Sequence, residues 1–73
     1  MDNSSLVQSD PEIMGGTPVF VGTRVPFQTF IDYLITGHTV PDFLEDYPTV
    51  KSDVAIAALE EAKEIIVTRA RAA

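Results

Sequence analysis

The sequence predicts a mainly α-helical fold in which a short amino-terminal β-hairpin precedes a three-helix bundle of the helix-turn-helix kind. Three observations predict it. Two β-branched runs flank Gly22-Thr23, and apolar residues recur at helical spacing from Phe27 onward. Turn signals at Gly37 and Pro48 then divide the rest of the chain into helical lengths. A chain of 73 residues has room for one small domain.

The hairpin is predicted between Pro18 and Pro26. Glycine at the first position of a type II′ turn adopts the required positive φ, so Gly22 is expected there. Two strands alone are marginal in water, and the helices must therefore cover them. Ahead of the domain at 9–73, residues 1–8 form either a flexible arm or, at 6–8, a short further strand.

The first helix is predicted from Pro26 to Thr36 and ends at Gly37, because glycine readily adopts the left-handed conformation that satisfies the last carbonyls. The second begins with a capping box of Thr39 and Asp42 and ends before Pro48. Each helix has one apolar face. The faces consist of Phe27, Phe30, Ile31 and Leu34 in the first helix and Val40, Phe43, Leu44 and Tyr47 in the second.

The third helix is predicted from Ser52 or Asp53 to Arg69. Its apolar residues cover more of the circumference than one small core can bury, which indicates a second surface for a partner. The alternative is a helix end that packs on its own hairpin. The expected inner face is Ala55, Ala58, Leu59, Ala62 and Ile66, and the apolar residues outside it are Val54, Ile56, Ile65 and Val67.

The composition is that of an acidic domain without covalent cross-links. Eleven acidic residues against five basic ones give a net charge of −6, and such a surface repels nucleic-acid phosphates. The chain has no cysteine and a single histidine, His38, which excludes disulfides and a Cys/His zinc site. Because so small a core often needs further support, we expect a homodimer.

The polar, negatively charged residues 1–5 do not fit a secretory or membrane signal, and no apolar run is long enough to cross a bilayer. We therefore expect a cytoplasmic protein without a membrane partner.

The run from Asp10 to Pro26, together with 43–50 and 57–60, resembles the signature of a prokaryotic family called domain of unknown function number four hundred and thirty-three. The resemblance implies a homeodomain-like or winged-helix-like fold and a tendency to dimerise. It also implies an antitoxin of a type II toxin-antitoxin pair, encoded beside a nuclease-like toxin. One residue departs from the pattern: Lys51 stands where similar proteins tend to place Ser or Thr, which shifts the helix cap to Ser52 or weakens it by roughly 1 kcal/mol.

The candidate contacts to DNA or phosphate are Arg24, Lys51 and Lys63. The exposed face of the third helix is mainly acidic, which weighs against DNA reading. Arg24 is better explained by pairing with a nearby carboxylate, because its planar fork suits that geometry. The carboxylates considered are Asp42, Glu45 and Asp46.

Those three carboxylates are spaced to lie on one helix face, where a hard cation is the functional interpretation and a solvated face the simpler one. No further ligand converges in the sequence, and His38 is expected in an exposed loop. No nucleophile, base and orienting group can be assembled. We predict no catalytic, cofactor or metal residue, and hence no enzyme.

The candidate partner interface consists of Val19 and Val21 in the hairpin and Ile65, Ile66 and Val67 in the last helix. The first functional hypothesis is a non-enzymatic antitoxin-like protein that acts as a dimer, binds a cognate toxin and contributes to operator binding. The alternative is a structural homodimer with no nucleic-acid role, which the acidic helix face favours.

Overall fold

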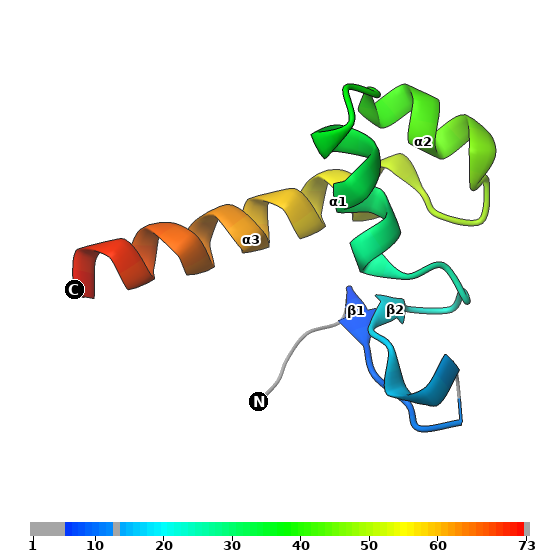
Figure 1. Ribbon diagram of the computed structural model, residues 1–73, viewed down its shortest axis with the longest axis horizontal. Helices are drawn as coiled ribbons and strands as arrows, with labels where there is room; N and C mark the ends of the chain where they lie inside the picture. Colours follow the sequence, from blue (N-terminus) through cyan, green and yellow to red (C-terminus); the bar gives the residue numbers. More distant parts are fainter. Residues whose placement is uncertain (1–5, 13, 73) are drawn as a thin grey trace.

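The computed structural model describes residues 6–12 and 14–72, and its elements confirm the predicted fold class. Figure 1 shows α1 and α2 beside the first turns of α3, the two strands below α1, and the rest of α3 extending away. The elements are β1 (Val7–Gln8), a 3₁₀ turn η1 (Met14–Gly16), β2 (Val19–Phe20), α1 (Phe27–Ile35), α2 (Val40–Asp46) and α3 (Ser52–Ala72).

The strand at 6–8 forms, and it supplies the partner of β2. Val7 lies opposite Phe20 and Gln8 opposite Val19 in an antiparallel pair. The first five residues of the predicted arm lie outside the described residues. The two-stranded sheet is therefore closed by a connection through η1, and not by the turn at Gly22.

Across Gly22 the predicted hairpin is reduced to one bridge between Val19 and Pro26. Two backbone hydrogen bonds accompany it, from the Phe20 N–H to the Val25 carbonyl and from the Phe27 N–H to the Pro18 carbonyl, each at 3.0 Å. The type II′ prediction is wrong. The Thr23 N–H donates to the Phe20 carbonyl at 3.0 Å, which places Gly22, with φ of 79°, at the third position of the turn, as in type II.

Helix α1 begins one residue later than predicted. Pro26 precedes the helix with an extended ψ of 137°, because its bridge to Val19 and the bond from the Phe27 N–H to the Pro18 carbonyl hold it against β2. The C-terminal prediction is confirmed. Gly37 has φ of 97°, and its N–H donates to the Leu34 carbonyl at 3.2 Å.

Helix α2 begins with the predicted capping box. The Thr39 hydroxyl accepts the Asp42 N–H at 3.2 Å, and the Asp42 carboxylate accepts the Thr39 N–H at 2.9 Å. The backbone hydrogen bond that the carboxylate accepts from Thr39 favours its ionised form and, with a further contribution from the Thr39 side chain, holds the pKa of Asp42 below its usual 3.8. The helix ends at Asp46, two residues before Pro48.

Three phenylalanines from three elements form the centre of the core. Phe20, Phe30 and Phe43 are fully buried. The ring centroids of Phe30 and Phe43 are 4.6 Å apart, and Phe20 lies 5.8 Å from Phe30. The buried residues packed around them are Val25, Val50, Ala55 and Ala58. The core therefore joins β2, α1 and α2 to the first half of α3.

The inner face of α3 is confirmed only for its first half. Ala55 and Ala58 are buried and Ala62 is half-buried, but Ile66 is 65% exposed, so its predicted burial is wrong. The helix has 21 residues and is about 32 Å long, whereas α1 and α2 have 9 and 7 residues. Short neighbours cannot cover so long a helix.

Replacing Phe30 with alanine is expected to lower the free energy of unfolding by about 3 to 5 kcal/mol, because it leaves a cavity between two aromatic rings. Ile35→Ala in the same helix is the control. Ile35 is 74% exposed, and we expect a change within about 0.5 kcal/mol. Urea denaturation measures both, and equal midpoints for the two variants would contradict this account of the core.

Asp42→Asn is expected to make the free energy of unfolding depend less on pH in the acidic range. The pKa of Asp42 is lowered by folding, so its ionised form stabilises the native state above pH 3.8, and this contribution is lost as the pH falls through the native pKa. Denaturant titrations at a series of acidic pH values test this. The same dependence of the unfolding free energy on pH in wild type and Asp42→Asn would contradict this prediction.

Candidate functional site

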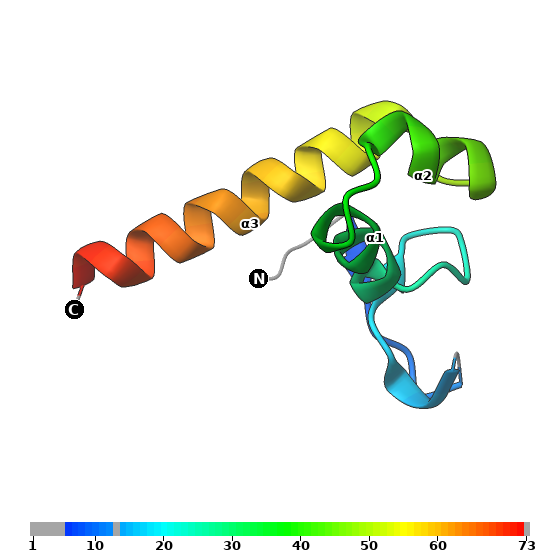
Figure 2. The same ribbon diagram turned by 45° about the horizontal axis from the view of Figure 1, so that its top comes forward.

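The face of α3 that enters the core continues beyond it. Ala55 and Ala58 are buried, whereas Ile65, which lies on the same line of the helix, is 51% exposed. Figures 1 and 2 both show the second half of α3 projecting from the body. We call residues 62–72 the distal part of α3. Ile65 and Ile66 of this part face solvent in the described structure, with 51% and 65% of their surface exposed.

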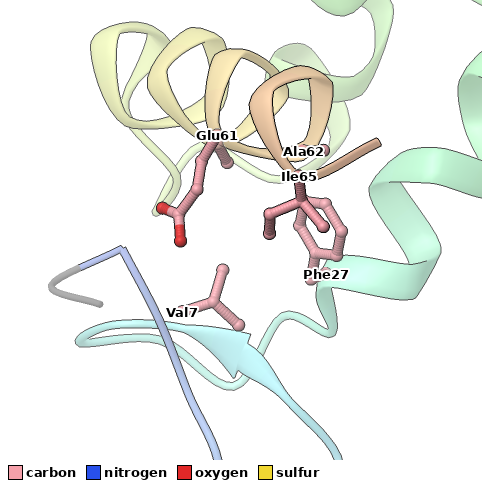
Figure 3. Close-up of a pocket in the computed structure, with 6 residues that line it drawn as sticks. Val7, Phe27, Glu61, Ala62 and Ile65 are labelled. Atoms are coloured by element: carbon pink, nitrogen blue, oxygen red, sulfur yellow. The ribbon is translucent and has the colours of Figure 1, made fainter. Parts of the chain in front are cut away.

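An apolar groove of about 160 Å³ lies where the distal part leaves the body. Figure 3 shows Ile65 beside the ring of Phe27, with Val7 across the gap and Glu61 to one side. The groove is lined by Val7, Phe27, Ala58, Glu61, Ala62 and Ile65. Sequence reasoning missed it because the strand containing Val7 closes the groove, and the sequence carries no signal for where that strand pairs.

A second apolar strip runs along the other side of α3. Ile56 and Val67 are eleven residues apart, which is close to three full turns, so they share one face. Ile56 is 45% exposed and Val67 is half-buried. Lys63 lies between them. The helix therefore offers apolar side chains on two faces, as expected of a helix held between two partners.

The charges on α3 are separated along its length. The carboxylates lie at or before Glu64, and Arg69 and Arg71 lie in the last turn, where cations interact favourably with the helix dipole. All are exposed. The acidic residues are Asp53, Glu60, Glu61 and Glu64.

The predicted interface residues divide into three groups. Ile65, Ile66 and Val67 lie together on the distal part of α3. Val21, which is 44% exposed, lies elsewhere, beside Lys51 and Val54 near the start of α3. Val19 is fully buried, so its prediction as an interface residue is wrong. Val19 pairs with Gln8 and bridges to Pro26, which leaves it between two strands.

Two of the three candidate phosphate contacts lie near each other. Arg24 and Lys51 border adjoining open grooves that share Thr23 and Thr49. Lys63 is twelve residues beyond Lys51 along α3, about 18 Å away. The structure therefore brings Arg24 and Lys51 onto one side of the body and leaves Lys63 apart.

Lys51 occupies the position before the first helical residue of α3. Its carbonyl accepts the Ala55 N–H at 3.0 Å, as an N-cap carbonyl does. Ser52 is the first residue of α3, so the cap has not shifted to it, and the Lys51 side chain has no oxygen to accept the free N–H groups of the first turn. The lysine therefore replaces a stabilising cap with an exposed cation at the start of α3.

The predicted ion pair between Arg24 and a carboxylate of α2 does not form among the described residues, and two of those carboxylates have other partners. Asp42 caps α2 and lies 3.9 Å from His38. The Tyr33 hydroxyl donates to Asp46 at 2.8 Å, and this bond raises the pKa of Tyr33 to about 12. The Arg24 side chain is exposed, so its guanidinium can contact a ligand.

The described residues contain no group of three His, Cys, Asp or Glu side chains placed to hold a metal ion. Within the same residues, no helix is both long and apolar enough to cross a membrane.

Residues 7–62 match the family described as protein of unknown function (DUF433). The chain belongs to the DUF433 family. The family match covers the body and ends as α3 leaves it. An uncharacterized protein, y4eO, from Sinorhizobium fredii is 42% identical over 48 residues, which are 66% of this chain and 22% of that protein. The chain thus spans about a fifth of the length of this relative.

A crystal structure of a DUF433 member from Anabaena variabilis has the same fold. Its TM-score is 0.71 at 24% identity, over 93% of this chain and 67% of that one. The similarity supports the arrangement of strands and helices described above for this DUF433 protein.

Proposed function

We propose that this DUF433 protein is a non-enzymatic, antitoxin-like interaction module of a type II toxin-antitoxin pair, and that α3 binds its protein partners. The observation that carries the proposal is the exposure of Ile65 and Ile66, at 51% and 65%, on a helix whose other end is buried. Burial of such side chains contributes roughly 1 to 2 kcal/mol each. Because the chain resembles antitoxin-associated proteins, we take the protein partner to be a toxin.

The charge of the chain fits a toxin that acts on nucleic acid. A nuclease-like protein presents basic surface to phosphates, and a chain with a net charge of −6 complements such a surface. Glu60 lies beside the strip of Ile56 and Val67, and Lys63 lies between them, so this face combines apolar side chains with charges of both signs. We assign the toxin contact to it. We propose the cytoplasm as the compartment of both activities.

Val67→Glu is expected to abolish neutralisation, because it puts a charge into the apolar strip of the toxin contact. The assay co-expresses the chain with the toxin-like protein encoded beside it, and measures growth and co-purification. Thr68→Glu is the matched control, since Thr68 is exposed, adjacent and on another side of α3. Growth rescue by Val67→Glu equal to that by Thr68→Glu would refute the assignment.

The second candidate is a structural homodimer with no nucleic-acid role. The specific observation that favours it is the acidic exposed surface of α3, which opposes a phosphate backbone. Measurement of DNA binding separates the two candidates.

We expect the antitoxin–toxin complex to retard its own upstream DNA, with Arg24 and Lys51 as the phosphate contacts. Arg24→Ala and Lys51→Ala should each weaken binding and lower the salt slope by about one. Arg71→Ala is the control, because Arg71 lies about 30 Å along α3 from Lys51. A complex that produces no shift at low salt, with or without the toxin, would leave the structural homodimer as the better account.

A further inference from the structure

We infer that two adjoining grooves on the body of the protein together bind an extended acidic segment of a partner protein. Carboxylates of the segment contact Arg24 and Lys51, and one apolar side chain of the segment lies beside Val21. The inference goes beyond the proposed function, in which the two cations contact DNA phosphates and the valine has no role. The partner is defined by its chemistry, an apolar residue close to carboxylates in an extended chain.

The two grooves adjoin and differ in size. They share Thr23 and Thr49, and their volumes are about 250 Å³ and about 620 Å³. The smaller is below the volume of roughly 300 to 1,000 Å³ that a compact small molecule requires. It can hold a single side chain, and the larger groove leads on from it. The pair therefore suits an extended chain that places one side chain in the smaller groove.

The charge of the grooves identifies the ligand as acidic. Among the described residues that line them there is no aspartate or glutamate, although the chain contains eleven. Each groove contains one cation, Arg24 in the larger and Lys51 in the smaller. Asp53, which follows shortly after Lys51, accepts the Val54 N–H at 2.8 Å. The grooves are therefore a basic site on an acidic protein, and they complement carboxylates.

The position of Lys51 supports an external anion. The residue directly precedes α3, where the positive end of the helix dipole disfavours a cation. Its exposed side chain forms no ion pair within the part of the chain that the structure describes. A carboxylate from another protein supplies the missing partner.

The apolar wall of the smaller groove favours a peptide over a nucleic acid. Phe20 and Val50 form its buried part, whereas Val54 is half-buried and Val21 is 44% exposed. A contact to DNA phosphates uses the cations and leaves this apolar surface in water. In an extended peptide, side chains two residues apart point to the same side, about 7 Å from each other. An apolar and an acidic side chain at this spacing can therefore cover the valine and meet a cation together.

The shared cations make the acidic segment and DNA alternative ligands. A chain whose Arg24 and Lys51 hold carboxylates cannot contact phosphates with the same groups. The acidic partner therefore releases the protein from DNA. This consequence is the one part of the inference that rests on the proposed function.

The test measures binding of a short fluorescein-labelled peptide to the purified chain by fluorescence anisotropy. The peptide carries one leucine, with a glutamate two residues away on each side. Lys51→Glu is expected to weaken binding at least about tenfold, because it reverses the charge that faces the glutamates. Val21→Ser is expected to weaken it about three- to fivefold through the loss of apolar contact. Lys63→Glu and Ile56→Ser make corresponding changes at exposed positions of α3 outside both grooves, and they should leave binding unchanged.

The chemistry of the ligand is tested on the wild-type chain, so this result does not depend on the folding of a variant. Replacing the leucine of the peptide with serine should weaken binding about as much as Val21→Ser does, and replacing its glutamates with glutamines should abolish binding. A wild-type chain that does not bind the acidic peptide, or that binds the glutamine peptide equally well, would overturn the inference. Equal binding of the leucine and serine peptides would overturn the assignment of the apolar wall.

This inference and the proposed function fail separately. The peptide assay contains neither toxin nor DNA, and neutralisation is assigned to the face of Val67. A complex that retards no DNA counts against the proposed function and leaves peptide binding in place. Where DNA is retarded, Val21→Ser should retain the retardation, and the leucine peptide should release the DNA at lower concentration than the serine peptide. Equal release by the two peptides would contradict competition at the grooves.

Discussion

The contact among Phe20, Phe30 and Phe43 is the one on which every other part of the structure depends. It joins β2, α1 and α2, and the chain has no disulfide to hold them together. The strands have two residues each and cannot persist alone. The orientation of α3 depends on the same contact, because Ala55 and Ala58 are small enough to let the helix approach the rings.

A core of this size has a consequence for function. It covers about half of α3, and the remaining turns keep the apolar pattern of the buried half without a covering layer. An apolar helix face that projects into water is costly unless another polypeptide covers it. The binding of a protein partner, as proposed above, would cover this exposed apolar surface.

Local chemistry was predictable from the sequence, and long-range contacts were not. Gly37 and the pair Thr39 and Asp42 were identified because the groups that they satisfy lie within a few residues. The pairing of Val7 with Phe20 was missed, since two short strands carry no signal for a partner across η1. The exposure of Ile66 depends on where along α3 the core ends, and helical periodicity alone does not predict that position.

The distribution of charge bears on how an acidic chain would approach DNA. Arg24 and Lys51 lie on one side of the body, at the other end of α3 from Arg69 and Arg71. The exposed carboxylates of α3 lie between these two basic regions and repel a phosphate backbone. If the proposed DNA contact forms, it would therefore fall to Arg24 and Lys51, and α3 would not itself read the groove.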